Sequence, residues 1–231
     1  MEDPVEYKLE GINQSQVDKK RGFDFSSGLR SILRQDPDVI MVGEIRDFET
    51  ADTAINAALT GHLVISTLHT NSASGAIPRF LSMGVKPFLL TPALNAIIGQ
   101  RLVRRICPDC MVDDKLDTEM TSKIDELMAK IAESELGELK GKKAAEIQWK
   151  KGGGCDACHG LGFKGRVGIY EIITMSKDIE AIISSEKVSE YAIEEIAVKQ
   201  GTVTMVQDGI LKAAEGITTV SEVFRVEKSL E

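Results

Sequence analysis

Short apolar runs alternate with amphipathic segments along the first hundred residues of the chain. Residues 39–42 read Val-Ile-Met-Val and residues 62–68 read His-Leu-Val-Ile-Ser-Thr-Leu, and short apolar runs of this kind are typical of buried parallel strands. Residues 47–59 carry alanine, isoleucine and leucine at helical spacing, which predicts a helix between the two strands. Strands that alternate with helices indicate a mostly parallel sheet flanked by helices. We therefore expect an α/β fold for residues 1–106.

Further helices are predicted before and after these strands in the sequence. The serines at residues 26–27 can cap a helix, which must end at the Asp-Pro-Asp of residues 36–38 because the residue before a proline is pushed out of the α region. A serine at position 72 or 74 can cap another helix. Residues 87–105 read as largely helical, with one apolar face.

The pattern changes after residue 106. Residues 111–150 are rich in lysine and glutamate, which fits a solvated helix or helical hairpin, and residues 165–173 alternate like a strand or hairpin. The remainder predicts helices over residues 179–183, 189–199 and 206–214, and a last capped turn at 217–222. We predict an α/β core over residues 1–106, a cysteine-containing module with a helical insertion over 107–160, and a small, mostly helical region over 161–231.

Two Cys-x-x-Cys pairs, Cys107/Cys110 and Cys155/Cys158, account for the four cysteines of the chain. Zn²⁺ binds four thiolates in a tetrahedron, and each pair can direct two sulfurs at one ion. The segment between the pairs is wider than the ~15–20 residues usual for such sites. Redox pairs and unlinked core cysteines remain alternatives, and His159 could replace one thiolate. We predict a structural zinc site.

Composition and charge narrow the possible functions. The chain has 231 residues, of which 42% are hydrophobic and 28% charged, with a net charge of -8. This acidic balance argues against a general nucleic-acid binder, whose affinity depends on a positive surface. No apolar run approaches the ~18 residues needed to cross a bilayer.

Carboxylates stand where the predicted strands end. Gly43 lets the backbone turn after residues 39–42, and Glu44 follows it. Ligands of open α/β sheets bind outside the carboxyl ends of the strands, where a carboxylate can hold Mg²⁺ or orient an attacking water. Glu2 and Asp3 offer a second pair of carboxylates that would face the same crevice. The alternatives are an acidic solvent-exposed loop for Glu44 and a charged N-terminus in solvent for Glu2 and Asp3.

Three arginines are candidates for contacts with phosphate. Arg30 and Arg34 lie four residues apart and should share one helix face, and the planar guanidinium suits phosphate oxygens. A solvated helix face is the alternative for this pair. Arg46 is a third candidate, although it could instead form a salt bridge with Asp47 or Glu49.

The predicted second strand is bracketed by histidines. His62 and His69 are seven residues apart, and this odd separation points them to opposite faces of a strand, so they are poor partners for one metal. His69 stands at the carboxyl end of the strand beside Thr67, Thr70 and Asn71, where a phosphate sensor would be placed. A hydrogen-bonded structural role is an equal alternative for His62. No G-x-x-x-x-G-K-[ST] phosphate-binding loop occurs in the chain.

Taken together, these segments closely resemble the secretion ATPases, the RecA-like motors of type II secretion and type IV pilus assembly. The resemblance rests on EDPVEY, GLRSILRQDPDVIMVGEIRDFETA, TGHLVISTLHTNSA and the CPDC and CDACHG pairs. It runs from residue 2 to about residue 171 and continues more weakly into the C-terminal helices.

The resemblance implies a role for each candidate residue. EDPVEY is similar to the aspartate box of this family, with Glu2 and Asp3 as its acidic residues, and DVIMVGE is similar to a Walker B strand that ends in Glu44. TGHLVISTLHT resembles the histidine box and contains both histidines. Arg30 and Arg34 correspond to arginines that family members direct at nucleotide phosphates.

The family resemblance also implies an assembly. It implies a hexameric motor driven by ATP and Mg²⁺ on the cytoplasmic face of the inner membrane, with a membrane platform protein as its partner. The tetracysteine pairs are a feature of assembly motors that retraction motors lack. The family's Walker A loop should precede the aspartate box, so we interpret this chain as the C-terminal part of such a motor. The alternatives are an inactive, zinc-stabilised scaffold and a zinc-ribbon nucleic-acid binder, and the acidic balance argues against the second.

Overall fold

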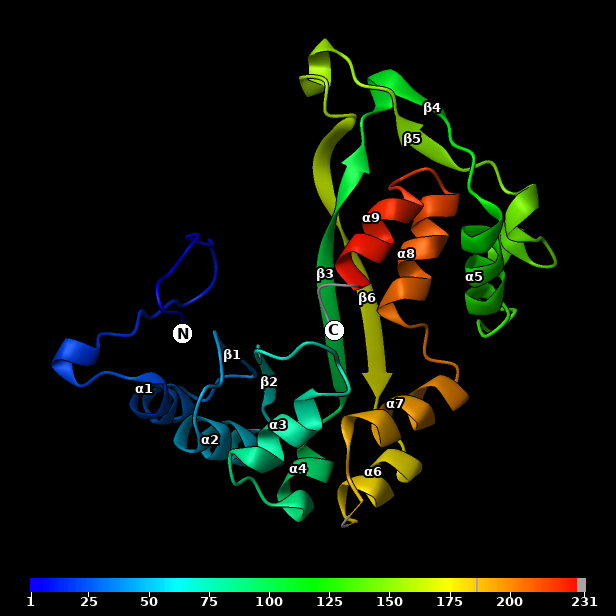
Figure 1. The fold of residues 1–231 in the computed structure, drawn as a ribbon. Coiled ribbons are helices and arrows are strands. Elements are labelled where there is room, and N and C mark those ends of the chain that lie inside the picture. The colour runs from blue at the N-terminus through cyan, green and yellow to red at the C-terminus, as the bar shows by residue number, and fades with distance from the viewer. Residues whose placement is uncertain (186, 228–231) are drawn as a thin grey trace. The chain divides into compact units, whose positions relative to one another are not determined.

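The computed structural model describes residues 1–185 and 187–227, which form two compact units (Figure 1). Unit 1 contains Met1–Ala96 and Met175–Ile193. Unit 2 contains Ile97–Thr174 and the residues from Glu194 on. Each unit therefore combines segments that are distant in sequence. The three-part division predicted above, with boundaries after residues 106 and 160, stays a prediction.

The sheet of unit 1 is a parallel pair. β1 (Val39–Val42) and β2 (Leu63–Ser66) pair in register from Val39 opposite Leu63 to Val42 opposite Ser66. α2 (Phe48–Leu59) connects them and starts at Asp47, whose side chain accepts the N–H of Thr50. The sequence prediction of a strand, a helix and a second strand is confirmed, although β2 is shorter than residues 62–68.

The two strands are covered on one face only. Ile40 and Val42 are buried, whereas Val39 and Met41 are 54% and 55% exposed. Parallel strands are normally buried on both faces, and the sequence predicted that arrangement for β1. This prediction is wrong for the described residues: α1 contacts β1 and α2 contacts β2, and Val39 and Met41 remain exposed.

α1 (Phe25–Ile32) begins two or three residues earlier than predicted. Its N-cap is Asp24 rather than Ser26 or Ser27. Asp24 accepts the N–H of Ser27, and the Ser27 hydroxyl accepts the N–H of Asp24 in a capping box. The buried Ser26 hydroxyl instead lies 3.3 Å from the Thr53 hydroxyl on α2, which joins the two helices.

The remaining helices of unit 1 are short. They are α3 (Ala76–Ser82), α4 (Pro87–Ala93), α6 (Lys177–Ile183) and the start of α7 (Glu190–Lys199). α3 starts after Gly75 without a side-chain cap, so neither predicted serine caps it, although the Ser72 hydroxyl accepts the Gly75 N–H.

The helix predicted over residues 87–105 ends much earlier. The chain becomes extended at Leu94, and β3 (Ala96–Ile106) follows. β3 pairs with β6 (Phe163–Thr174), which runs in the opposite direction (Figure 1). The helical prediction is therefore wrong beyond α4, because an apolar spacing that fits a helix also fits a strand whose partner is distant in sequence.

Unit 2 is built on this two-stranded ribbon. α8 (Met205–Ala214) packs against β6 and against α9 (Val220–Glu227). Val103, Ile169, Met205 and Val226 form a buried cluster with the half-buried Val167. The last element of the described residues is α9, a helix of eight residues, rather than the capped turn predicted at residues 217–222.

The lysine- and glutamate-rich segment contributes a second cluster to unit 2. α5 (Thr118–Met128) buries Ile124 and Met128 against Trp149, Ile210 and other residues of α8 and α9. Two 3₁₀ turns, Gly137–Leu139 and Ala144–Glu146, follow α5, so the segment is one helix and not a helical hairpin. Two short antiparallel strands, β4 (Met111–Asp113) and β5 (Lys150–Gly152), close it.

Among the described residues, no helix combines the length and the apolar character needed to cross a membrane.

Candidate functional site

Glu44 lies at the carboxyl end of β1, in an irregular turn of residues 43–45. Three hydrogen bonds fix this turn. The Gly43 N–H donates to the Met1 carbonyl at 2.7 Å, the Gly43 carbonyl accepts the Thr67 hydroxyl at 2.7 Å, and the Ile45 N–H donates to the Thr67 carbonyl at 3.0 Å. The end of β1 is thereby joined to Met1 on one side and to the segment after β2 on the other.

One oxygen of the Glu44 carboxylate contacts two neighbouring side chains. Oε2 lies 2.5 Å from Arg46 Nε and 3.2 Å from His69 Nε2. The Glu44 side chain is nearly buried, whereas those of Arg46 and His69 are largely exposed. A salt bridge with Asp47 or Glu49 was the alternative considered for Arg46, but the arginine pairs with Glu44 instead. Glu44 and His69, predicted separately from two strand ends, are thus in direct contact.

The second pair of predicted carboxylates lies beside the same turn. Met1 pairs with the end of β1 through its N–H₃⁺, which donates to the Met41 carbonyl at 2.7 Å, and through its own carbonyl. This places the backbone of Glu2 against Gly43. The Glu2 carboxylate accepts a hydrogen bond from the Gln14 amide at 2.8 Å. Asp3 follows directly in the chain.

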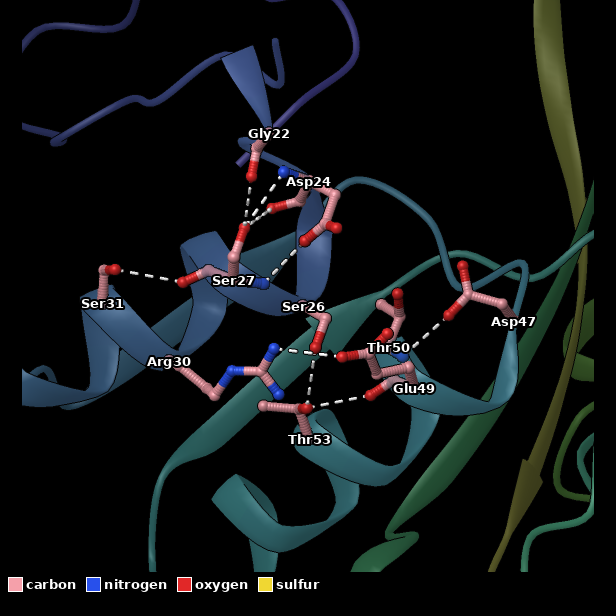
Figure 2. Close-up of polar contacts among 10 residues, drawn as sticks. All are labelled: Gly22, Asp24, Ser26, Ser27, Arg30, Ser31, Asp47, Glu49, Thr50 and Thr53. Carbon is pink, nitrogen blue, oxygen red and sulfur yellow. Dashed lines mark hydrogen bonds and ion pairs between the residues drawn. The ribbon is translucent and has the colours of Figure 1, made fainter. Parts of the chain in front are cut away.

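Arg30 is tied to α2 by an ion pair. Its Nη2 lies 3.0 Å from Glu49 Oε1, and both side chains are about half exposed. Figure 2 shows the pair between α1 and α2. Thr53 donates its hydroxyl to the Glu49 carbonyl at 2.8 Å and thus links this pair to Ser26 (Figure 2). An exposed ion pair of this kind contributes little stability, so Arg30 can exchange Glu49 for another anion at small cost.

The other two predicted ligands lie elsewhere in unit 1. Arg34 is in the 3₁₀ turn Leu33–Gln35, beyond the end of α1, so it does not share a regular helix face with Arg30. His62 Nδ1 lies 3.0 Å from the Ala57 carbonyl and 3.2 Å from the Thr60 hydroxyl at the end of α2. This is the local, structural hydrogen bonding considered for His62.

A small pocket lies between the N-terminal ends of α1 and α2. Helix N-termini favour anions, and Arg46 reinforces this, but the capping aspartates and Glu49 oppose it. The pocket therefore does not identify a ligand by itself. Its lining consists of Asp24, Phe25, Ser26, Arg46, Asp47, Glu49 and Thr50.

The four cysteines of unit 2 converge on one point. Their sulfurs all lie within 4.8 Å of one another, and the separations are 3.9 Å for Cys107–Cys155, 3.8 Å for Cys110–Cys158 and 3.7 Å for Cys155–Cys158. Sulfurs at ~2.3 Å from a tetrahedral zinc ion lie about 3.8 Å apart. The donor set and its spacing therefore fit Zn²⁺.

The backbone around the cysteines explains how two Cys-x-x-Cys pairs that are far apart in the sequence come together. β4 and β5 pair between the two knuckles, and the Gly153 N–H donates to the Cys110 carbonyl at 2.8 Å. A side chain at residue 152 would clash with the backbone of Gly162, since a Cβ there would lie 1.9 Å from its carbonyl oxygen. The insertion that contains α5 thus begins and ends at the paired strands β4 and β5.

The surroundings of the Cys158 and Cys110 thiols shift their pKa values in opposite directions. N–H groups of Cys155 and Gly162 donate to Cys158 Sγ at 3.2 Å each, and these bonds lower the pKa of Cys158 to about 6. Burial raises the pKa of the Cys110 thiol to about 12. A bound cation would offset this cost, because it stabilises all four thiolates together.

Glu49 and Thr67 were named from the sequence, but their observed contacts were not predicted. Glu49 faces Arg30 only because α1 packs on α2, and no local pattern reveals that contact. Thr67 gave a partial signal, as a polar residue at the carboxyl end of an apolar strand. Its bonds to both sides of Glu44 depend on the pairing of β1 with β2.

Known proteins resemble this chain along nearly its whole length. A family model described as "Type II/IV secretion system protein" matches residues 1–225. The type IV pilus assembly ATPase PilB of Thermus thermophilus is 48% identical over 228 residues, which are 97% of this chain and 24% of that protein. The type II secretion system protein E of Pseudomonas aeruginosa is 46% identical over 226 residues, 98% of this chain and 42% of that protein. The chain thus spans less than half the length of these relatives.

Solved structures give the same picture of the fold. The pilus retraction motor PilT, solved with bound ADP, has a TM-score of 0.60 at 27% identity, covering 97% of this chain and 50% of that one. The ATPase DotB of Legionella pneumophila has a TM-score of 0.64 at 21% identity, covering 99% of this chain and 50% of that one. Both comparisons support an α/β fold.

Proposed function

The chain belongs to the type II/IV secretion system protein family, and we propose that it provides the catalytic carboxylate of an ATP-hydrolysing motor for type II secretion or type IV pilus assembly. The single observation that carries this proposal is Glu44, a nearly buried carboxylate at the end of a parallel strand, held by Arg46 and His69. Parallel sheets bind their ligands at this edge. A RecA-like arrangement of the sheet is part of the proposal.

Each residue of the site has a chemical task in this proposal. Glu44 organises Mg²⁺ and polarises the attacking water, with Glu2 and Asp3 adding negative charge toward the metal. Arg30 and Arg34 contact nucleotide phosphates and stabilise the charge that develops on them. His69 senses the phosphate. Arg46 and His62 are the remaining candidate nucleotide-binding residues. Arg46 holds the Glu44 carboxylate, and His62 stabilises the end of α2 through its local hydrogen bonds.

The 231 residues contain no G-x-x-x-x-G-K-[ST] phosphate-binding loop. The working enzyme combines the site with such a loop, binds ATP with Mg²⁺ and acts as a homo-hexamer. It works on the cytoplasmic face of the inner membrane, where a membrane platform protein is its partner. This assembly rests on the family membership, and relatives named as ATPases support the nucleotide.

Replacing Glu44 tests the proposed function. In a form of the protein that includes a phosphate-binding loop, Glu44→Gln should lower the rate of ATP hydrolysis by about 10²- to 10⁴-fold while ATP still binds. Glu10→Gln, on an exposed loop, is the matched control and should leave hydrolysis unchanged. Hydrolysis that survives in Glu44→Gln would contradict the assignment.

An inactive scaffold is the second candidate function, and the missing phosphate loop favours it for these 231 residues taken alone. Titration calorimetry of the purified chain with MgATP separates the two. Heat of binding supports a nucleotide site within the chain. No heat, together with an unchanged melting temperature, supports the scaffold.

We also propose that Cys107, Cys110, Cys155 and Cys158 bind one structural zinc ion. The sulfur spacing near 3.8 Å is the supporting observation. Metal analysis of the protein purified in reducing buffer should find close to one Zn²⁺ per chain. Cys107→Ser or Cys155→Ser should lower that content, and metal-free wild-type protein would contradict the proposal.

A further inference from the structure

We propose that Thr67 is a positioning residue for Glu44: its hydroxyl sets the direction of the carboxylate and the contact between Glu44 and His69. The inference rests on the proposed function of Glu44. It extends the structural role of Thr67 in the turn to the function of Glu44, and it concerns bonds found entirely within unit 1.

The first argument is the backbone of the turn. Residues 43–45 belong to no helix or strand, so their course depends on individual hydrogen bonds. Two of the three bonds that fix the turn come from Thr67: its hydroxyl donates to the carbonyl just before Glu44 at 2.7 Å, and its carbonyl accepts the N–H just after Glu44 at 3.0 Å. Glu44 is therefore bracketed by one residue.

The second argument is the side chain of Glu44. Its described contacts, from Arg46 and His69, both fall on Oε2. His69 is two residues beyond Thr67 on the same segment. The Thr67 hydroxyl therefore fixes the spacing between the strand end that carries Glu44 and the segment that carries His69. A carboxylate whose Oε2 is held in this way presents Oε1 in a defined direction.

The hydroxyl is the decisive group because the rest of the turn has other supports. Ile45 is 5% exposed and anchors the chain after Glu44 through burial. The backbone carbonyl of Thr67 is kept in any variant. Thr67→Val therefore removes one hydrogen bond with almost no change of shape. Thr67→Ser keeps that bond, which makes it the conservative rescue.

Two measurements test the inference. In the ATP-hydrolysing form of the protein, Thr67→Val should lower kcat by about 10- to 100-fold, since a displacement near 1 Å of a reacting group costs up to about 10²-fold. KM should stay within about twofold. Thr67→Ser should restore most of kcat. Ser82→Ala, which removes an exposed hydroxyl bonded at 2.8 Å to the Arg79 carbonyl of α3, is the matched control.

The second measurement uses the 231-residue chain and needs no hydrolysis. The ring signals of His69 in ¹H–¹⁵N NMR spectra should shift in Thr67→Val and keep their wild-type positions in Thr67→Ser and Ser82→Ala. Unchanged ring signals in Thr67→Val overturn the inference. So does a kcat that survives in Thr67→Val, a KM that rises while kcat is kept, or a serine variant as poor as the valine variant.

These results are separable from a failure of the proposed function. If Glu44→Gln does not reduce hydrolysis, the catalytic role of Glu44 is wrong. The ring signals of His69 still decide in that case whether Thr67 holds Glu44 and His69 together.

Discussion

Glu222 shows how a buried charge is used within the fold of unit 2. Its side chain is 2% exposed and lies 2.5 Å from Arg104 Nη2 and 2.8 Å from Arg225 Nε. The Arg104 N–H also donates to it at 3.1 Å. Burial alone would raise the pKa of Glu222, but the hydrogen bonds from the two arginines outweigh it and lower the pKa to about 2. α9 is thereby attached to β3.

The depressed pKa of Glu222 predicts a loss of stability in acid. The folded protein binds the proton of Glu222 less readily than the unfolded chain, so this contribution is fully present above the ordinary pKa of 4.5 and is lost as the pH falls toward 2. Glu222→Gln should lower the free energy of unfolding at pH 7 by about 1–3 kcal/mol. It should also make the free energy of unfolding change less with pH between these two values. Urea unfolding at several pH values, followed through Trp149, measures both effects.

The exposed Glu215 provides the control for this prediction. Glu215→Gln should change neither the stability nor its pH dependence, because surface substitutions have small effects. A variant at Glu222 with the same acid sensitivity as the wild type would show that other carboxylates cause the loss.

Single residues were predictable from sequence only where their partners are local. Glu44 and His69 could be placed at strand ends because a strand end is defined by its own residues. The partner of Arg30 could not be predicted, because Glu49 reaches it through the packing of α1 on α2. Arg46 shows a subtler limit, since three carboxylates are near it in sequence and only the turn of the backbone selects Glu44.

Helix packing in unit 2 depends on one glycine. A Cβ on Gly209 of α8 would lie 2.7 Å from Cγ1 of Val223, which is fully buried in α9. Alanine at residue 209 would gain about 1 kcal/mol of helix propensity. Because the branched valine cannot turn away cheaply, we expect overpacking to dominate and Gly209→Ala to destabilise the protein by about 1–3 kcal/mol.

Thermal unfolding of Gly209→Ala measures this effect, and a second substitution identifies its cause. Val223→Ala should be destabilising alone, because it opens a cavity. In the double variant the new methyl group should partly fill that space, so the two losses should be less than additive. A Gly209→Ala variant that is more stable than the wild type would mean that α8 and α9 move apart to accommodate the methyl group without loss of stability.

Whole elements were predictable where the pattern is short and strongly apolar. β1 was predicted with its observed limits, because an apolar run between Asp-Pro-Asp and a glycine leaves little choice. β3 was predicted as part of a helix, because its identity as a strand depends on β6, which follows almost 60 residues later. The covering of a strand is equally non-local, and the exposed Val39 and Met41 could not be foreseen from their own run.

At the scale of the molecule, the four cysteines can directly stabilise only one of the two units. All four belong to unit 2, and the paired strands β4 and β5 connect them to the cluster around Trp149. Unit 1 contains no cysteine and has its own buried residues on β1, α2 and α6. A metal bound by the cysteines therefore contributes its binding free energy to the folding of unit 2.

Removing the metal should consequently loosen unit 2 first. Trp149 is the only tryptophan of the chain, is 5% exposed and donates its Nε1–H to the Ala144 carbonyl at 2.8 Å, so its fluorescence reports on this core. With a chelator, the thermal transition seen by Trp149 should move to lower temperature. Hydrogen exchange at the amides of Ile40 and Val42 should keep its rate, because β1 lies in unit 1. Adding back Zn²⁺ should restore the transition, and Cys107→Ser should abolish that recovery. If the amides of β1 lose protection together with the Trp149 signal, the two units unfold as one cooperative body, and the cysteine site stabilises the strand that carries Glu44 as well.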